Sequence, residues 1–190
     1  MKYFKVDTLG DADEMLACID RAPKELGIKD YYMARGETIG GDYPKKSIMQ
    51  LNEYSGFILR SLIGNIIGYL IVDTLMKQCI EQSKNNEIEY LPFILLNHKG
   101  KEHSTDYWII NPIGSVDALD IENSIVRRGK RTGEIVGIKE AVFNNKSLEN
   151  APDLFRIPQK HPNYYVSERL VECWRGIGAT NVLLTEIRAV

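Results

Sequence analysis

Cysteine is scarce in this chain, and its few copies are widely separated. The 190 residues include three cysteines, Cys18, Cys79 and Cys173, and no Cys-x-x-Cys pair. An odd number of distant cysteines is not typical of a disulfide framework, which small secreted domains build from even numbers. The sequence therefore predicts reduced thiols and a cytoplasmic protein.

A strong charge of one sign is also missing. The formal net charge is −2, whereas non-specific binding to nucleic acid requires a strongly basic surface. One local exception is the segment 127–131, which has four cations in five residues. Charge runs usually lie in water, so the segment is interpreted as a solvated hairpin tip, with contact to a phosphate or an acidic partner as the alternative. No nucleic-acid partner is predicted.

No apolar run is long enough for a membrane span. The stretch that comes nearest, residues 57–76, is interrupted by Arg60, Asn65 and Asp73, and a span needs about 20 predominantly apolar residues. The first seven residues alternate charged and apolar side chains, and they lack the unbroken apolar segment of a signal peptide. The sequence predicts no membrane partner.

Histidine is too rare and too scattered to suggest a metal site. His98 and His103 share one polar turn and His161 lies in another loop, with no third ligand nearby. A metal site needs converging His, Cys, Asp or Glu ligands. The Gly-rich segment 36–46 contains Pro44 and follows no apolar strand, so it is interpreted as a turn and not as a phosphate-binding loop. No metal and no cofactor are predicted.

Residue patterns of nucleophilic and acid–base catalysis are absent as well. The cysteines fall on predicted helix faces, where thiols behave as small hydrophobic side chains, and there is no Gly-x-Ser-x-Gly motif. Two carboxylate pairs, Asp117 with Asp120 and Glu87 with Glu89, are interpreted as turn and strand-edge residues. General acid catalysis needs two carboxyls in different environments, which a sequence does not reveal. No catalytic residue is predicted, and the chain is not expected to be an enzyme.

The chain alternates short apolar segments with turns, which indicates an α+β fold. Strands are predicted over residues 2–6, 55–63, 65–72, 87–96, 107–111 and 134–143, and helices over residues 11–21 and 73–83. Strands 87–96 and 107–111 are predicted to form a β-hairpin, and strand 134–143 is expected to pair back through the turn 127–133. We predict a single domain, residues 1–190, with a mixed, mostly antiparallel sheet and two or three helices packed on it.

Residues 70–80 and 164–174 echo each other at a constant offset. In both, a short strand ends at Val, a helix-capping residue follows, and a cysteine stands six positions later. The capping residues are Asp73 and Ser167. We interpret the echo as an internal strand–helix–strand repeat, with coincidence among common residue types as the alternative. The repeat predicts Cys79 and Cys173 at equivalent buried helix positions and two neighbouring strands in each copy.

Two pairs of adjacent aromatic residues are candidates for a binding surface, Tyr107 with Trp108 and Tyr164 with Tyr165. Successive side chains of a strand point to opposite faces, so one member of each pair is expected to face outward. Exposed Tyr and Trp are favoured where proteins bind each other. A place at the edge of the core is the alternative.

An ordered series of short segments runs through residues 66–187. The segments are Tyr90-Leu91-Pro92, Tyr107-Trp108-Ile109-Ile110-Asn111-Pro112, Val116-Asp117-Ala118-Leu119-Asp120, Leu154-Phe155-Arg156 and Val166-Ser167-Glu168-Arg169-Leu170, followed by residues 176–183. In this order they resemble the bacterial polymorphic-toxin immunity proteins of the myxobacterial type, a group also known as a domain of unknown function. Residues 1–62 match less well and are predicted to be a variable N-terminal part, with residues 63–190 as the family-like part. The chain departs from the family at Asp73, where Ser is usual, but Asp caps a helix equally well.

The resemblance implies an immunity function, in which the chain binds and neutralises a cognate toxin. It brings no established catalytic residue, cofactor or metal. The partner it implies is the toxin protein, and a homo-oligomer is left open. Candidate toxin-contacting residues are Tyr107, Asp117, Asp120 and Tyr164. Two alternatives remain: an enzyme that processes a small molecule with a site assembled from His98, Asp117 and Arg156, and an assembly protein.

Overall fold

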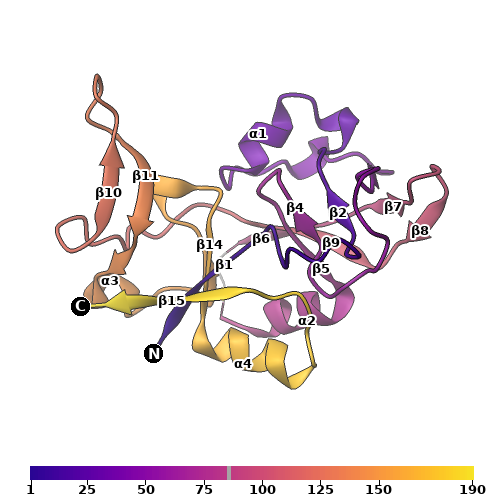
Figure 1. Cartoon of the computed structure of the whole chain (residues 1–190). Coiled ribbons are helices and arrows are strands. Elements are labelled where there is room, and N and C mark those ends of the chain that lie inside the picture. The colour runs from indigo at the N-terminus through magenta and orange to yellow at the C-terminus, as the bar shows by residue number, and fades with distance from the viewer. Residues whose placement is uncertain (85–86) are drawn as a thin grey trace.

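The computed structural model describes residues 1–84 and 87–190 of the chain (Figure 1). The first elements are β1 (Tyr3–Val6), β2 (Cys18–Ile19), η1 (Lys24–Leu26), α1 (Lys29–Met33), η2 (Gly40–Asp42), β3 (Ile48–Gln50), β4 (Gly64–Asn65), β5 (Leu70–Asp73), α2 (Thr74–Gln82), β6 (Ile88–Pro92), β7 (Ile94–Leu96) and β8 (Glu102–Ser104). They are followed by β9 (Tyr107–Pro112), β10 (Ile125–Arg128), β11 (Ile135–Glu140), β12 (Val142–Phe143), α3 (Asn145–Leu148), β13 (Leu154–Phe155), η3 (Pro158–Lys160), β14 (Tyr164–Ser167), α4 (Glu168–Gly176) and β15 (Leu184–Ala189). No helix in these two ranges is long and apolar enough to cross a bilayer.

The strands form several small sheets, and the predicted α+β class is confirmed. The largest sheet has the order β12-β15-β1-β14-β13, and two three-stranded sheets have the orders β5-β9-β6 and β3-β7-β8. Most neighbouring strands are antiparallel, whereas β12 with β15, β2 with β4 and β3 with β7 are parallel. The sheets are therefore mixed and mostly antiparallel, as predicted, although the strands do not join into one sheet.

The predicted internal repeat is present as β5-α2-β6 and β14-α4-β15. Each helix begins at the predicted capping residue: the Asp73 side chain accepts a hydrogen bond from the Met76 amide, and the Ser167 side chain accepts one from the Leu170 amide. The two strands of each unit are not neighbours, however, because a third strand lies between them. β9 pairs antiparallel with both β5 and β6, and β1 pairs antiparallel with both β14 and β15.

Helices α2 and α4 pack against each other, and a disulfide joins Cys79 to Cys173. The two cysteines stand at equivalent helix positions, as predicted; Cys79 is buried and Cys173 is half-buried. The prediction of three reduced thiols is wrong for this pair. The cysteines are 94 residues apart in sequence, and the packing of the two helices brings them together. Cys18 is unpaired and lies on β2, not on a helix.

Two inner strands, β9 and β14, are covered on both faces. Along β9, Ile109 packs into a cluster with the N-terminal part of the chain, and Ile110 packs into a second cluster with α2 and α4. Along β14, Tyr164 joins the second cluster, and Tyr165 joins a third cluster with β13 and α3. Burial on both faces explains why these strands are apolar at successive positions and do not alternate.

The helix predicted over residues 11–21 is wrong. The segment is extended: Leu16 forms a β-bridge with Ile58, and β2 pairs in parallel with β4. The apolar residues of this segment have helical spacing, but tertiary packing decides its conformation. Leu16 is buried by partners from elsewhere in the chain. Gly56 permits this close approach, because a Cβ at that position would lie 1.9 Å from the Met15 carbonyl oxygen.

The strand predicted over residues 87–96 is divided at Phe93 into β6 and β7, which belong to different sheets. The predicted hairpin with residues 107–111 is confirmed for β6 and β9. The prediction of a regular strand over residues 55–63 is wrong, since that segment contributes only isolated β-bridges. Local patterns therefore located the strands better than they located the sheets.

The predicted hairpin around the basic turn is confirmed as β10 and β11. Its turn is closed by hydrogen bonds from the Gly129 amide to the Glu134 carbonyl oxygen and from the Gly133 amide to the Gly129 carbonyl oxygen. Among the described strands, β10 and β11 pair only with each other, and the hairpin projects from the body of the molecule (Figure 1).

Candidate functional site

A group of polar side chains surrounds Arg156, which is 1% exposed. Its guanidinium donates hydrogen bonds to the carbonyl oxygens of Ala34 (3.0 Å) and His161 (2.6 Å) and to the hydroxyl of Tyr164 (2.7 Å). The guanidinium carbon also lies 4.2 Å from the centroid of the Tyr164 ring. Arg156 therefore ties the segment after α1 to the loop before β14, with oxygen dipoles and an aromatic face around its charge.

Asn111 links Arg156 to a second polar group around Glu89. The Asn111 amide donates to a carboxylate oxygen of Glu89 (2.9 Å), while its Oδ1 accepts from Arg156 (3.4 Å). Glu89 also accepts hydrogen bonds from the Thr38 hydroxyl (2.6 Å) and the Gly40 amide (2.7 Å). Burial raises the pKa of Glu89, but the hydrogen bonds outweigh it and hold the pKa below its ordinary value.

These two polar groups are suited to building the fold rather than to chemistry. Arg156 and Tyr164 are buried, and the Glu89 carboxylate is engaged by four donors. Burial and the positive charges of Arg35 and Arg156 lower the pKa of His161, so this imidazole is neutral at pH 7. A catalytic group must come within reach of a substrate, and these side chains hold segments of the chain together instead.

A third polar group lies at the start of α4. Asp153 is 0% exposed and accepts hydrogen bonds from the Ser167 hydroxyl (2.6 Å), the Arg169 guanidinium (2.6 Å) and the Lys84 amide (2.7 Å). Ser167 also accepts from the Leu170 amide (3.3 Å), which confirms it as the helix cap. The Ser167 hydroxyl is thus engaged by the fold as both donor and acceptor.

The four predicted contact residues divide into two buried and two accessible side chains. Tyr107 is 6% exposed and donates a hydrogen bond to the Arg60 carbonyl oxygen (2.9 Å), and burial raises its pKa to about 12. Tyr164 is 0% exposed. The expectation that these tyrosines face outward is wrong, because packed side chains cover both faces of β9 and β14.

Asp117 and Asp120 lie in the irregular segment between β9 and β10. Asp117 is exposed and accepts a hydrogen bond from the Gln159 amide (2.8 Å). Asp120 is partly exposed and accepts hydrogen bonds from the side-chain amide (2.9 Å) and backbone amide (3.0 Å) of Asn123, which lower its pKa. The Asp120 amide donates to the Val142 carbonyl oxygen, so Asp120 lies at the base of the β10–β11 hairpin.

The alternative active site of His98, Asp117 and Arg156 is not assembled. His98 is exposed in the turn between β7 and β8, whereas Arg156 is buried. Figure 1 shows that turn on the opposite side of the molecule from the β10–β11 hairpin, which follows the segment of Asp117. In residues 1–84 and 87–190, no three His, Cys, Asp or Glu side chains gather in a way that would hold a metal ion.

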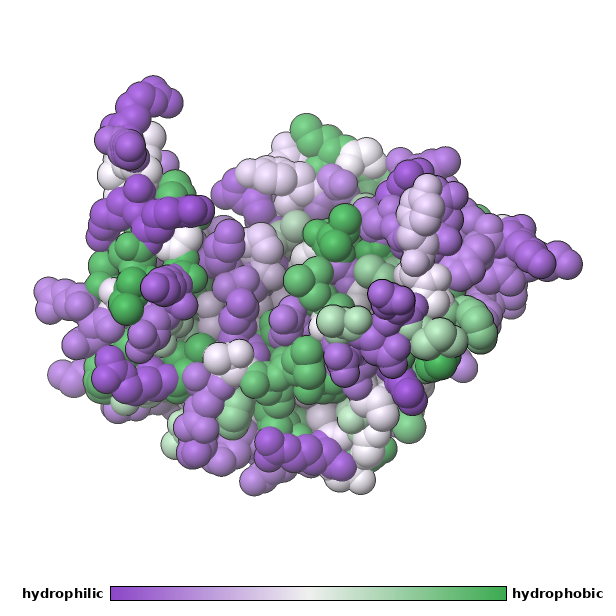
Figure 2. All heavy atoms as spheres, viewed as in Figure 1, coloured by the Kyte–Doolittle hydropathy of each residue, from purple (hydrophilic) through white to green (hydrophobic). Residues whose placement is uncertain are grey.

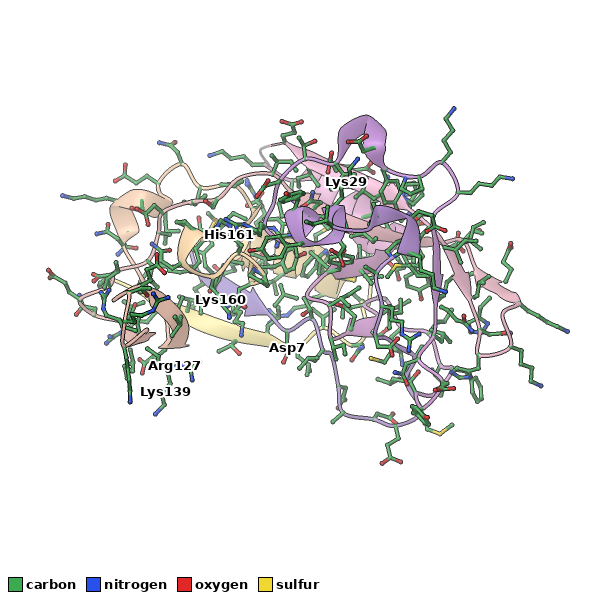
Figure 3. All side chains as sticks on the ribbon, turned by 90° about the horizontal axis from the view of Figure 1, so that it is seen from above. Asp7, Lys29, Arg127, Lys139, Lys160 and His161 are labelled. Atoms are coloured by element: carbon green, nitrogen blue, oxygen red, sulfur yellow. A yellow bond between two sulfur atoms is a disulfide. The ribbon has the colours of Figure 1, made fainter. Side chains whose placement is uncertain are left out.

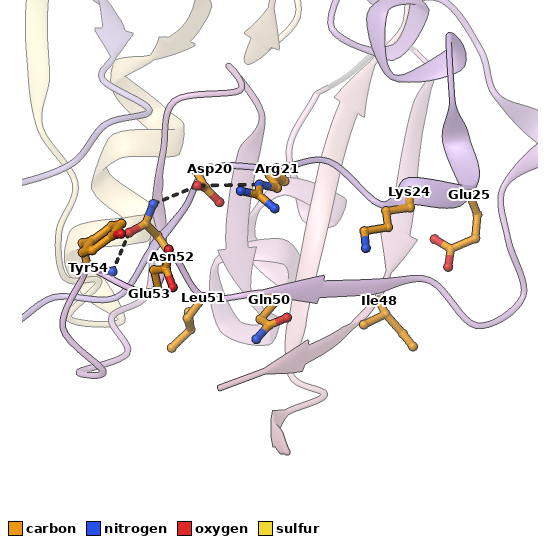
Figure 4. A pocket seen from close by; sticks show the side chains of 10 residues that line it. All are labelled: Asp20, Arg21, Lys24, Glu25, Ile48, Gln50, Leu51, Asn52, Glu53 and Tyr54. Atoms are coloured by element: carbon orange, nitrogen blue, oxygen red, sulfur yellow. Dashed lines mark hydrogen bonds and ion pairs between the residues drawn. The ribbon is translucent and has the colours of Figure 1, made fainter. Parts of the chain in front are cut away.

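A groove with a volume of about 430 Å³ opens between residues 20–25 and residues 48–54 (Figure 4). Charges of both signs line it, and Tyr54 at its margin is 89% exposed. A mixed-charge surface with an exposed tyrosine suits contact with another protein. Sequence reasoning missed the groove because its two walls are separate segments that only the fold brings together.

Comparison with protein families identifies a match over nearly the whole chain. The sequence model described as the immunity protein family Imm11 matches residues 5–188. That range includes most of the N-terminal part, as well as the groove, the polar groups and the projecting hairpin. A search of curated proteins finds no match.

Proposed function

Because this chain belongs to the immunity protein family Imm11, we propose that it binds and neutralises a cognate bacterial toxin, and that it does so without catalysis. One observation carries the proposal. Asn111, Arg156 and Ser167, which belong to the family-like segments, are buried and hydrogen-bonded within the fold. Residues used in this way build a scaffold, and immunity by binding requires a scaffold with an accessible surface and no reactive group.

The toxin contact is assigned in this proposal to the segment between β9 and β10, with Asp117 and Asp120 as contact residues. Both carboxylates are accessible at least in part. They lie on an irregular segment held between regular strands, a setting that binding residues often occupy. Tyr107 and Tyr164 are left out of the proposal, since their side chains are buried.

The first experiment measures protection. The product of the adjacent gene is produced in a heterologous host with and without this chain, and the toxin is then purified and weighed by intact mass spectrometry. We expect relief of toxicity, co-purification of the two proteins, and a toxin of unchanged mass. A neighbouring product that stays toxic and does not co-purify contradicts the proposal, and a changed toxin mass favours an enzyme.

The second experiment tests the two carboxylates with charge-matched variants. Asp117→Asn with Asp120→Asn removes two charges and keeps one of the two Asp120 oxygens that accept from Asn123. Glu102→Gln with Asp106→Asn removes two exposed charges near β8 and serves as the control. We expect the first variant to lose about 2 kcal/mol of toxin affinity, the usual size for a central contact, and the control to bind like the parent. If both variants bind the toxin like the parent, the interface lies elsewhere on the surface.

The cytoplasmic location belongs to the proposal and depends on the state of the cysteines. Disulfides are rare in the cytoplasm, where glutathione and thioredoxin keep thiols reduced, yet Cys79 and Cys173 are joined here. Acid quenching of intact cells, followed by alkylation of free thiols in denaturant, tests the compartment, with Cys18 as an internal control. Alkylated Cys79 and Cys173 support the cytoplasm, and a protected pair contradicts it.

A further inference from the structure

The β10–β11 hairpin, residues 125–140, concentrates positive charge in a chain that is otherwise acidic. Its cations are Arg127, Arg128, Lys130, Arg131 and Lys139, and its carboxylates are Glu134 and Glu140. Five cations against two carboxylates give the hairpin a net charge of +3. The whole chain carries −2, so the remaining residues carry −5. The hairpin is therefore a basic projection on an acidic body.

The cations of the hairpin are open to solvent and are not neutralised by the fold. All five are exposed. None takes part in an ion pair of the described residues. Arg128 donates a hydrogen bond to the Gly133 carbonyl oxygen (2.9 Å), which braces the turn but leaves the positive charge uncompensated by a carboxylate.

Near its base the ribbon turns apolar side chains toward the core and cations toward solvent. Val126 and Ile138, which are paired across the ribbon, pack against the third core cluster. Arg127 is paired with Gly137, and Lys139 follows two residues later on the same face. Figure 3 shows Arg127 and Lys139 close together at one end of the molecule. The core thus anchors one face and leaves the other free to meet a partner.

The tip of the hairpin stands clear of the rest of the surface. Figure 2 shows it as a hydrophilic projection above the body. A two-stranded ribbon is narrow, since paired strands lie about 4.8 Å apart. Such a shape suits insertion into a concave surface better than contact with a flat one.

We propose that residues 127–131 at this tip insert into a carboxylate-lined cleft of the toxin. This inference rests on the proposed function. Guanidinium groups pair with carboxylates through two parallel hydrogen bonds, which gives both strength and orientation. Opposite charge also steers the encounter and raises the association rate. Asp120 lies at the base of the same hairpin, so the proposed carboxylate contacts adjoin the hairpin.

An acidic protein fits the hairpin better than a nucleic acid does. Residues 125–140 contain no Phe, Tyr or Trp, whereas proteins that hold single strands stack bases on aromatic side chains. A duplex is long enough to reach past the narrow ribbon to the body, whose net charge of −5 repels a polyphosphate backbone. A carboxylate-lined cleft needs to meet only the tip.

The test compares two charge-matched variants. Lys130→Ser with Arg131→Ser removes two tip cations, and Lys99→Ser with Lys101→Ser removes two exposed cations from the β7–β8 turn. Association with the product of the adjacent gene is measured at low and high salt. We expect the tip variant to associate about tenfold more slowly at low salt, the difference to vanish at high salt, and the control to match the parent. A tip variant as fast as the parent, or equal losses in both variants, overturns the proposal.

A second measurement separates this inference from the proposed function. Binding of polyglutamate and of a DNA duplex at low salt is measured for the parent and both variants. We expect the parent to prefer polyglutamate and the tip variant alone to lose that binding. A preference for the duplex that the tip variant loses overturns the proposal in favour of nucleic acid. If the parent binds polyglutamate but not the product of the adjacent gene, the preference of the hairpin for carboxylates is supported and the proposed function is contradicted.

Discussion

Single residues explain how the polar groups in the core of this chain are used. Asn111 joins the polar groups of Glu89 and Arg156, and Asp153 joins Ser167 to Arg169. Each of these groups connects segments that are distant in sequence. Substitutions here are therefore expected to act on stability, and to reach toxin binding only through unfolding.

Glu89→Gln is expected to cost about 1–2 kcal/mol of unfolding free energy at pH 7, because four donors then face a neutral amide. The pKa of Glu89 is lowered in the folded state. The stability that its charge contributes is therefore present above the unfolded pKa of about 4.3 and is lost as the pH falls through the folded pKa.

Urea unfolding of the parent and of Glu89→Gln between neutral and acid pH measures this effect. The two unfolding free energies should converge at the acid end. The exposed neighbour Glu87 provides the control, and Glu87→Gln should follow the parent throughout. A difference that stays constant across the whole range would refute stabilisation by the Glu89 charge.

Ser167→Ala is expected to cost about 2–3 kcal/mol. Loss of a helix cap accounts for about 1 kcal/mol, and the rest comes from removing a donor to the buried Asp153 carboxylate. Ser167→Thr keeps a hydroxyl and should recover part of the loss. Thermal unfolding gives the measurement, and toxin protection should persist at a permissive temperature. Lost protection with unchanged melting would point to a role other than capping.

At the scale of elements, the two strand–helix–strand units are joined through their helices. Removing the link with Cys79→Ala and Cys173→Ala is expected to cost about 3 kcal/mol, since cross-links that close long loops restrict the unfolded chain strongly. A reductant should lower the melting temperature of the parent and leave the double variant unchanged. Cys18→Ala should keep the parent's response. If reductant does not change the melting temperature of the parent, the disulfide does not contribute to its stability.

The units themselves were predictable because their signals are local. A capping residue followed by apolar positions at helical spacing defines α2 and α4 without knowledge of the rest. The strands inserted into the units, β9 and β1, were not predictable, because no local pattern states which distant strand enters a gap. The same limit of local patterns applies to the four candidate contact residues. Asp117 is exposed and Asp120 is partly exposed, as expected of residues in a turn. Tyr107 and Tyr164 are buried, because burial on both faces of a strand depends on the whole fold.

At the scale of the whole molecule, the groove and the hairpin compete as binding surfaces. A standard interface buries about 800 Å² on each partner, which is a small part of the 10456 Å² exposed here. Tyr54→Ala decides between the two surfaces. It should leave the unfolding free energy within about 0.5 kcal/mol of the parent, because the side chain is 89% exposed, and it should leave toxin affinity unchanged. An affinity loss in this variant, with none in the tip variant, would assign the interface to the groove.

The place of β1 between β14 and β15 also sets the order in which the chain can be completed. During synthesis β1 leaves the ribosome long before β14 and β15, so the largest sheet closes only after residues 164–189 have been made. A chain shortened near Ala189 loses part of β15, which pairs with β1, and so the lost segment is not a dispensable tail. Under the proposed function, a copy cut before β15 is then expected to give no protection, although it still contains Asp117, Asp120 and the whole β10–β11 hairpin.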